Sequence, residues 1–412
     1  MKYNYIKFKI LAITAFFITL TLPFSSCTTA KKDSDSTVDN STVDNSTVDN
    51  STVDNLTGKV KSFSQYSFEA VNRLGNIEKG KRMIYSESDF QEIYDDRGNQ
   101  IEKNYYSSDG SLESKYTYKF DDNGNKIEEN SYNSDGSLER KYTYKFDDNG
   151  NQIERNSYNS DGSLESKYTY KFDDKGNQIG TNKYSPRGGL LGKYTIKYDN
   201  KGNQIERIQY SFDESLLGKN TFKYDDKGNQ IEENQYNSDG SLGSKNTFKF
   251  DDKGNKIEEN FYNSDGSLGS KNTFKYDDRG NQIEENKYNS DGSLFRKLTF
   301  KYDDRGNQIE RNFYSSETGL TMKTSYKFDD KENKIEENFY NSDGSLFHKL
   351  TFKFDDKKNK IEENSYNSTG SLDSKKSYKY DFDKKGNWIK QTVFIDEIPR
   401  YLIERETEYF NK

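Results

Sequence analysis

The chain is poor in the residue types that most often build reaction centres and metal sites. Its 412 residues include one cysteine, one histidine and one tryptophan. Without a cluster of cysteine or histidine there is no candidate transition-metal site, and a lone cysteine can form no disulfide within the chain. We therefore expect no metal ion and no cofactor, and the role of Cys27 has to be argued from its position.

Apolar residues are also scarce, at 29% of the chain, which excludes a thick aliphatic core. The 33 tyrosines and 27 phenylalanines are nevertheless far more aromatic residues than a disordered chain carries, so the chain should fold. Acidic residues exceed basic residues by seven, and the two signs are interleaved along the sequence. A nucleic-acid-binding protein would need a basic face, so we expect no nucleic-acid partner.

The N-terminus has the pattern of a targeting signal. Three lysines among the first nine residues precede an apolar run over residues 10–22, which is too short for an ordinary membrane span. The run leads to the sequence FSSC, residues 24–27, which resembles the lipobox of bacterial lipoproteins. The resemblance implies that residues 1–26 are removed as a signal peptide and that an acylated Cys27 anchors the protein in the membrane. A free thiol or an intermolecular disulfide is the alternative for Cys27.

A low-complexity segment follows this anchor. Residues 27–55 contain four copies of STVDN, with no aromatic residue and one valine per copy, so we expect a disordered linker. The cysteine is followed by Thr28, whereas an aspartate at that place retains some lipoproteins at the inner membrane. The resemblance therefore implies an outer-membrane lipoprotein, on either the periplasmic or the surface side.

From residue 92 to residue 395 the sequence repeats with a period of 26 residues, and such a period decides the architecture. One unit reads FKYDDKGNQIEENQYNSDGSLGSKNT, and its second turn motif, YNSDGSL, recurs almost unchanged in several copies. We count twelve units and assign residues 56–91 to an N-terminal cap and residues 396–412 to a C-terminal cap or tail. The glycine of the first turn motif stands at Gly98, Gly124, Gly150, Gly176, Gly202, Gly228, Gly254, Gly280, Gly306 and Gly386, and it is replaced by Glu332 and Lys358 in two units.

Each unit carries two turn signals, and strands of about eight to ten residues connect them. Asp-Asp-Lys-Gly and Asn-Ser-Asp-Gly both fit a type I turn that is followed by a glycine with positive φ. With tight turns, Phe222 should lie opposite Ile231, and Glu232 should lie opposite Lys245. Alternation along the strands then predicts an apolar face with Phe222, Tyr224, Ile231, Leu242, Phe248 and Phe250, and a charged face with Lys223, Glu232, Lys245 and Thr247.

The predicted fold is all-β, an extended superhelical antiparallel meander of tandem β-hairpins with about two dozen strands. Wide sheets curl because strand twist accumulates, and coiling should let the apolar face cover itself. We expect the two ends of the array to stay apart. The last segment contains Pro399 and many charges, which discourage pairing between strand edges.

The motif Tyr-x-Tyr/Phe-Asp-x-x-Gly-Asn-x-Ile, followed by Tyr and then Gly-x-Leu, resembles the YD repeats of Rhs-type proteins and of short lipid-anchored proteins of Bacteroidetes. It covers about residues 92–395. The resemblance implies a spiralling sheet of hairpins, which large Rhs proteins use as a shell around a toxin. Smaller relatives use it for surface contacts, with carbohydrate binding proposed. No effector domain and no aspartyl cleavage region can be recognised after Trp388, so a toxin shell is not expected.

No pattern in the array favours catalysis. His348 stands at a strand position that other units fill with residues such as serine and arginine, which assigns it to the repeat rather than to a site. An EF-hand around Gly124 would place Lys119 and Asn130 at its first and last ligand positions, so that calcium site is excluded. Adjacent glutamates such as Glu128 and Glu129 point to opposite faces of a strand and cannot act as a paired acid and base. We therefore expect no enzymatic activity.

One repeat position is the better functional candidate, because it holds a tyrosine in eleven units and the alternation places these tyrosines on the charged face. Rings on every second strand, roughly 10 Å apart, can stack on sugar rings or grip a partner. The structural alternative is that each ring covers the glycine or serine beside it. These residues, called the tyrosine ladder below, are Tyr106, Tyr132, Tyr158, Tyr184, Tyr210, Tyr236, Tyr262, Tyr288, Tyr314, Tyr340 and Tyr366.

The sequence thus supports a non-enzymatic, lipid-anchored repeat protein of the cell envelope that presents a long binding face to a polysaccharide or a surface protein. A structural spacer without a specific ligand is the alternative, as is an accessory to an Rhs-type toxin system. Binding that depends on the tyrosine ladder separates the first hypothesis from the second.

Overall fold

The computed structural model describes residues 59–85 and 89–410, which form one antiparallel sheet of 27 strands and contain no helix. The chain divides into two units, Met1–Asp44 and Asn45–Lys412, and every described residue belongs to the second. Cys27, the predicted signal peptide and the predicted linker lie outside the described residues. In the described part of the chain, no helix is long and apolar enough to cross a membrane.

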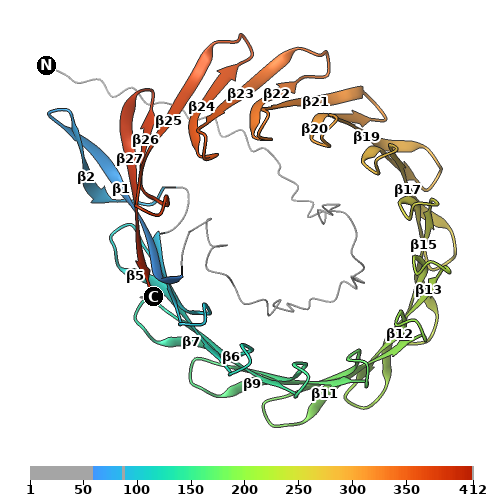
Figure 1. Ribbon diagram of the computed structural model, residues 1–412. Coiled ribbons are helices and arrows are strands. Elements are labelled where there is room, and N and C mark those ends of the chain that lie inside the picture. Colours follow the sequence, from blue (N-terminus) through green and yellow to red (C-terminus); the bar gives the residue numbers. More distant parts are fainter. Residues whose placement is uncertain (1–58, 86–88, 411–412) are drawn as a thin grey trace, which may run out of the picture. The chain divides into compact units, whose positions relative to one another are not determined.

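The strands follow one another as a meander (Figure 1). The first fourteen are β1 (Val60–Arg73), β2 (Asn76–Arg82), β3 (Asp89–Tyr94), β4 (Gln100–Tyr106), β5 (Leu112–Phe120), β6 (Lys126–Tyr132), β7 (Leu138–Phe146), β8 (Gln152–Tyr158), β9 (Leu164–Phe172), β10 (Gln178–Tyr184), β11 (Leu190–Tyr198), β12 (Gln204–Ser211), β13 (Leu216–Tyr224) and β14 (Gln230–Tyr236). The others are β15 (Leu242–Phe250), β16 (Lys256–Tyr262), β17 (Leu268–Tyr276), β18 (Gln282–Asn289), β19 (Leu294–Tyr302), β20 (Gln308–Ser315), β21 (Gly319–Phe328), β22 (Lys334–Tyr340), β23 (Leu346–Phe354), β24 (Lys360–Asn367), β25 (Leu372–Phe382), β26 (Trp388–Ile395) and β27 (Ile398–Tyr409).

The first turn of each unit is held by its leading aspartate. In the second repeat unit, Asp121 Oδ1 accepts hydrogen bonds from the backbone N–H groups of Asn123 and Asn125, at 2.9 and 2.8 Å. The Gly124 N–H donates to the carbonyl oxygen of Asp121 at 3.1 Å, and Gly124 has a φ of 86°. This geometry confirms the predicted tight turn with a glycine in the left-handed region.

The second turn is closed by a different side chain, the aspartate at its third position. Asp135 Oδ1 accepts from the backbone N–H of Ser137 at 2.9 Å, and Asn133 Nδ2 donates to Ser137 Oγ at 3.0 Å. Gly136 has a φ of 79°. In the motif YNSDGSL, the Asn-Ser-Asp-Gly-Ser part is therefore turn chemistry, and it fixes where each hairpin begins.

Two units adopt the same first turn without glycine, and this predicts a stabilising change. Glu332 and Lys358 have φ values of 66° and 67°, a region in which a side chain costs about 1–2 kcal/mol. The double variant Glu332→Gly, Lys358→Gly should raise the free energy of unfolding by about 1 kcal/mol per site, measured by urea denaturation. The reverse change at the same repeat position, Gly228→Glu, should lower it by a similar amount. Equal midpoints for all three proteins would contradict this account.

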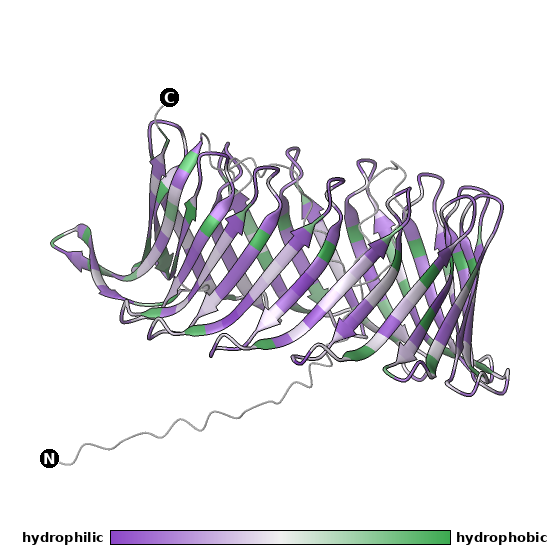
Figure 2. Cartoon of the chain, turned by 90° about the horizontal axis from the view of Figure 1, so that it is seen from below, coloured by the Kyte–Doolittle hydropathy of each residue, from purple (hydrophilic) through white to green (hydrophobic). Residues whose placement is uncertain are grey.

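The strand register differs from the predicted one by two residues. Phe222 pairs with Glu233 rather than with Ile231, and Glu232 pairs with Lys223 and Thr247 rather than with Lys245. The cause is a register shift at both ends of each strand, next to the turns, because a β-bulge there takes up an extra residue. A shift of two residues leaves the side chains in the middle of each strand on their predicted faces. Hydrophilic and hydrophobic residues alternate along the strands accordingly (Figure 2).

One residue of the predicted apolar face does change sides. Leu242 pairs directly with Tyr236, while the next pair towards the middle of the strands is Ser244 with Gln235. The bulge lies between these two pairs, and paired residues share a face of the sheet. Leu242 therefore stands with the tyrosine ladder on the charged face, which corrects its predicted place.

The sheet is closed, which corrects the prediction of an open superhelix with separate ends. β1 pairs with β27 over Val60–Glu69 on one edge and with β3 over Ser62–Gln65 on the other. All strands except β2 therefore join one ring of 26, and β2 pairs only with β1 as a projecting hairpin (Figure 1). Closure leaves no long strand edge unpaired in the ring. This gain outweighs the loss of one backbone hydrogen-bond donor at Pro399. Pro399 lies at a register irregularity of β27, ahead of the segment that pairs with β1.

Closure also explains where the core lies. At about 4.8 Å per strand the ring measures on the order of 125 Å around, so its opposite walls are far more than the ~10 Å of packed sheets apart. Neither face can cover itself, which corrects the expectation that coiling buries the aromatic rings. Of the ten buried hydrophobic residues among those described, eight lie where β1, β3 and β25–β27 meet: Val60, Phe63, Ala70, Tyr94, Tyr378, Val393, Leu402 and Ile403.

This junction of the first and last strands, called the seam below, is the best-packed part of the sheet. Phe63 is fully buried beside Val60 and Tyr94, and its ring centroid lies 5.6 Å from that of Phe90. Val393 and Ile403 form a second cluster with Tyr378. The repeat units carry no comparable core, so most of their stability has to come from contacts between neighbouring strands.

Candidate functional site

The tyrosine ladder lies on the charged face, as the alternation predicts. Tyr236 stands between Lys219 on one neighbouring strand and Leu242 on the other, and the same arrangement recurs along the array. The rings are half-buried in all eleven units. Where the contact is closest, lysine ammonium groups lie over the rings, 5.1 Å from the centroid for Lys193 on Tyr210 and 5.6 Å for Lys323 on Tyr340. The ladder thus combines accessible aromatic surface with adjacent cations.

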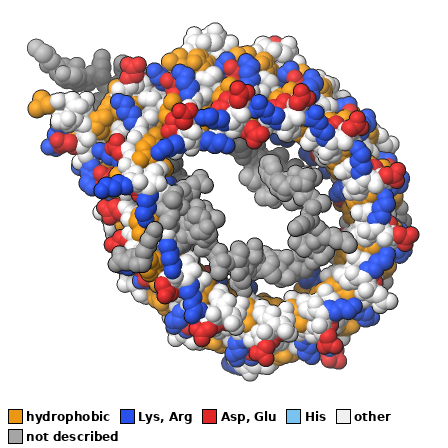
Figure 3. Space-filling model, viewed as in Figure 1, with side chains coloured by type: hydrophobic (Ala, Val, Ile, Leu, Met, Phe, Trp, Pro, Cys, Tyr) orange, Lys and Arg blue, Asp and Glu red, His pale blue; other side chains and the backbone are white. Residues whose placement is uncertain are grey.

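A belt of alternating charge runs beside the ladder. Glu232 bridges two lysines, with Oε1 at 2.7 Å from Lys223 Nζ and Oε2 at 2.7 Å from Lys245 Nζ. The glutamate side chain is only 15% exposed, whereas the two lysine side chains are 65% and 34% exposed. The contact between Glu232 and Lys245 was predicted, although it runs diagonally rather than directly across the strands. Positive and negative side chains consequently alternate around the sheet (Figure 3).

The same carboxylates receive hydrogen bonds from a row of asparagines that the sequence analysis did not single out. Asn234 Nδ2 donates to Glu232 Oε1 at 2.9 Å and to Thr221 Oγ1 at 3.3 Å. The asparagine recurs at intervals of 26 residues between the glutamate and the ladder tyrosine, with Ile208 as the exception, and this recurrence was the signal that could have revealed it. Its buried members are Asn104, Asn130, Asn156, Asn234, Asn260, Asn286, Asn312, Asn338 and Asn364.

These contacts lower the pKa of the belt glutamates. Burial alone would raise their pKa, but hydrogen bonds from two lysines and an asparagine outweigh it and lower the pKa of each to about 2. The groups affected in this way are Glu128, Glu154, Glu232, Glu258, Glu284, Glu310 and Glu336. They are fixed negative charges rather than proton donors at neutral pH.

Within the eleven units that carry a ladder tyrosine, the belt is interrupted once, at Gly180, where the other units have the glutamate. This predicts a second stabilising change. A Cβ at Gly180 would have its nearest neighbour at 3.5 Å, which is ordinary contact, and the residue has no left-handed φ. Gly180→Glu should therefore pair with Lys171 and Lys193 and raise the unfolding free energy by about 1 kcal/mol, from the ion pairs and from the loss of a strand glycine. Gly180→Ala isolates the second contribution. A Glu variant no more stable than the Ala variant, by thermal melting at low salt, would contradict the ion-pair contribution.

The opposite face is the one predicted as the apolar face. It is called the aromatic face below, because its aromatic rings alternate with charged side chains. Lys126 Nζ lies 5.4 Å from the ring centroid of Tyr118 and 5.8 Å from that of Tyr144, and it pairs with Glu129 Oε2 at 2.7 Å. Lys256, Lys334 and Lys360 repeat this bridge between units. Burial raises the pKa of Tyr118 to about 12, with a further contribution from the Glu129 carboxylate. These rings serve packing between units rather than proton transfer.

Tyrosines of the aromatic face also tie consecutive units together. The hydroxyl of Tyr224 donates to the carbonyl oxygen of Gln204 in the preceding unit at 2.8 Å, and Tyr198, Tyr276, Tyr302 and Tyr380 make the same bond. Other units have phenylalanine at this position, so the ring packs in every unit and the hydroxyl adds a hydrogen bond in some of them. Tyrosine is therefore a structural residue on this face, in contrast to the ladder.

His348 lies among aromatic rings, with its centroid 5.6 Å from Phe339 and 6.5 Å from Phe347. His348 therefore packs against the aromatic side chains of its own repeat unit. Among the described residues, no group of three or more histidine, cysteine, aspartate or glutamate side chains is placed to hold a metal ion. The turn aspartates instead accept hydrogen bonds from their own turns, as Asp121 does.

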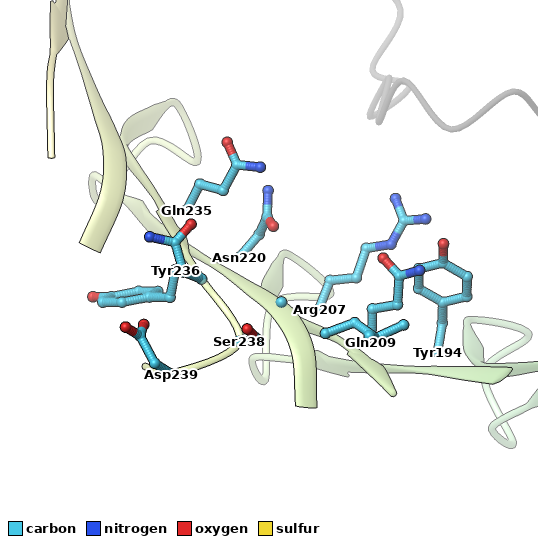
Figure 4. A pocket seen from close by; sticks show the side chains of 11 residues that line it. Tyr194, Arg207, Gln209, Asn220, Gln235, Tyr236, Ser238 and Asp239 are labelled. Carbon is cyan, nitrogen blue, oxygen red and sulfur yellow. The ribbon is translucent and has the colours of Figure 1, made fainter. Parts of the chain in front are cut away.

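The sheet is hollowed where the units depart most from the repeat. A cavity of about 620 Å³ lies against β12–β14 and the turn after Tyr236. Arg207, Gln209, Asn220 and Gln235 point to one side of the sheet there, while Tyr236 points to the other (Figure 4). This cavity was not predicted from the sequence, because it results from the loss of side chains at particular positions.

Comparisons with known proteins give solved structures only. No family model and no curated protein sequence matches the chain. A mutant Tc holotoxin pore of Photorhabdus luminescens matches 76% of this chain and 19% of its own at 12% identity and a TM-score of 0.37. The crystal structure of TcdB2-TccC3-TEV matches 82% of this chain and 27% of its own at 10% identity and a TM-score of 0.21. A porin-like protein from Bacteroides uniformis matches 85% of this chain and 96% of its own at 8% identity and a TM-score of 0.15.

Proposed function

We propose that this protein is a non-enzymatic component of the bacterial envelope whose charged face, with the tyrosine ladder, binds an extended partner. The observation that supports this most is the recurrence of a half-exposed ring at one strand position in eleven units. Packing alone does not require it, because the sheet has no second layer for these rings to cover. A ring on every second strand presents stacking surfaces at a spacing of roughly 10 Å.

The preferred partner is a polysaccharide. Sugar rings stack on aromatic side chains, and their hydroxyl groups are satisfied by the lysine, glutamate and asparagine side chains that flank each tyrosine. A repeating ligand matches a repeating site, since each added unit contributes a weak contact and the contacts act together. An acidic or basic protein surface fits less well, because the belt alternates in sign.

We further propose that Cys27 is acylated and that the folded part stands at the outer membrane on the linker of residues 27–55. This proposal rests on the sequence FSSC and on the composition of the linker. Cys27→Ser should release the protein from the membrane fraction, and protease treatment of intact cells should digest the array if it lies on the surface side. Retention of the serine variant in the membrane would contradict acylation.

The tyrosine ladder is tested by replacing four consecutive members, Tyr262, Tyr288, Tyr314 and Tyr340, with serine. If each ring contributes about 1 kcal/mol to stacking on a sugar, binding to a bacterial and host glycan array should fall at least tenfold. The matched control replaces Tyr198, Tyr224, Tyr276 and Tyr302 on the aromatic face with phenylalanine, which other units already carry, and should bind as the wild type does. Unchanged binding, or an unchanged envelope phenotype, in the ladder variant would favour a structural spacer without ligand.

A further inference from the structure

The cavity at β12–β14 differs from the rest of the array in a way that suggests a second ligand. At the repeat position of Gly218, other units have serine, arginine, methionine or histidine, and glycine occurs only there and at Gly192. The missing side chain opens the sheet surface beside Gln209, with which Gly218 pairs. The volume of about 620 Å³ lies within the range of about 300–1,000 Å³ that small-ligand sites occupy.

The side chains that line the cavity are polar apart from Leu217 and the tyrosine rings, and they include one cation with no ion-pair partner among the described residues. The Arg207 guanidinium carbon lies 4.7 Å from the ring centroid of Tyr194, and no described residue forms an ion pair with Arg207. Amides surround it, from Gln209, Asn220 and Gln235. Asn220 Nδ2 donates to Glu233 at 3.2 Å, which leaves its oxygen for a ligand. A planar guanidinium fixed on a tyrosine ring is suited to bidentate binding of a carboxylate.

The cavity also has a polarity along its length. Asp239 lies at the end away from Arg207 and Tyr194 (Figure 4). Its Oδ1 already accepts from the Ser241 backbone N–H at 2.9 Å, which holds that carboxylate in the turn. An anionic group should therefore bind at the arginine end, and neutral hydroxyl groups should lie towards the aspartate.

A comparison within the chain separates this site from an ordinary arginine–tyrosine contact. Two units earlier, Arg155 stacks on Tyr142 at 4.9 Å in the same repeat positions. There the places of Gln209 and Gly218 are taken by Ser157 and Ser166, whose hydroxyl groups lie 2.6 Å apart. Ser157 is 6% exposed, so that unit has no hollow at this place.

We propose that this cavity binds an acidic sugar, with its carboxylate on Arg207, its hydroxyl groups on Gln209, Asn220 and Gln235, and its ring beside Tyr194. The site lies on the aromatic face. It borders the ladder residue Tyr236, but the ring of Tyr236 points to the other side of the sheet (Figure 4), so the site goes beyond the proposed function.

The test uses oligogalacturonate and its methyl ester, in which a methyl group on each carboxylate removes the charge. Fragments of hyaluronan and heparosan serve as further acidic probes. Wild-type protein should bind at least one acidic probe by calorimetry, and Arg207→Gln should weaken that binding about tenfold or more. Arg155→Gln should leave it unchanged. Gly218→Met, which introduces the residue of position 322, should abolish it by filling the cavity while the thermal midpoint stays near that of the wild type.

Three results would overturn the proposal: no binding of any acidic probe, equal binding of the methyl ester, or equal effects of Arg207→Gln and Arg155→Gln. Each leaves the proposed function standing if the serine variant of the ladder still loses glycan-array binding. Conversely, loss of acidic-sugar binding in Arg207→Gln with no effect of the ladder variant would retain this site and reject the ladder.

Discussion

Replacing Phe63 with alanine is expected to destabilise the protein by about 3–5 kcal/mol, the cost of removing a buried phenylalanine from a packed site. Phe63 is fully buried in the seam, between Val60 and Tyr94, and the Arg405 guanidinium carbon lies 5.3 Å from its ring centroid. The seam is the one place where the first strand meets the last, so its loss should also open the ring. The measurements are urea denaturation and small-angle scattering.

The matched control is Phe248→Ala, in a repeat unit on the aromatic face. Phe248 is only half-buried and has no second layer above it, so its removal should cost about 1–2 kcal/mol and leave the ring closed. Equal destabilisation by the two changes would mean that the seam is not the core of the molecule. An unchanged scattering profile for a strongly destabilised Phe63→Ala protein would mean that the seam does not hold the ring closed.

Acid should destabilise the protein over a defined range of pH. The belt glutamates have a pKa of about 2 in the folded protein and 4.5 in an unperturbed chain. The folded state therefore binds fewer protons between these values. Its stability should be constant above about pH 5 and fall steadily as the pH decreases from 4.5 to 2. The seven Lys–Glu–Lys groups together should contribute on the order of 5 kcal/mol to the free energy of unfolding at neutral pH, after allowance for solvent screening of the exposed lysines.

Thermal melting at pH 7, 4, 3 and 2 measures this dependence, and added salt should reduce it because the lysines are solvent-exposed. The carboxyl groups of the turns act in the same direction, since hydrogen bonds within each turn lower the pKa of aspartates such as Asp135 and Asp239. Replacing Glu232, Glu258 and Glu284 with glutamine should make the melting temperature less dependent on pH. The part of the dependence that comes from the turn aspartates should remain. A melting temperature that is independent of pH down to 2 would contradict the role of the belt.

Most of the repeat unit could be predicted from the sequence because its determinants are local. The turn residues fix both hairpins, and strict alternation places Lys223 and Glu232 on one face and Phe222 on the other. The register was wrong by two residues because the bulges beside the turns absorb residues that a sequence pattern counts as paired. Leu242 was misplaced for the same reason.

Closure of the ring could not be predicted, because the information lies in two non-repeating segments far apart in the chain. Lys79 and Glu404, which form an ion pair at 2.7 Å across the seam, are separated by 325 residues. Arg82 and Asp89 form another pair there, at 2.6 Å, with the aspartate side chain fully buried. The irregular ends were interpreted as caps that avoid pairing, whereas their apolar residues are complementary to each other.

The cavity escaped prediction for a different reason. In a repeat, the informative positions are those where one unit departs from the others, and glycine at 218 or glutamine at 209 looks like ordinary variation in a list of units. Only the strand pairing brings Gln209 next to Gly218 and Arg207 next to Asn220.

The proposed function is tested most directly by hydroxyl-radical footprinting of the protein with and without the glycan that the array identifies. The binding account predicts that the ladder tyrosines, from Tyr106 to Tyr366, are protected together, whereas Tyr118 and Tyr144 on the aromatic face are modified at the same rate in both samples. Unchanged modification of the ladder at saturating glycan would contradict the claim that this face binds.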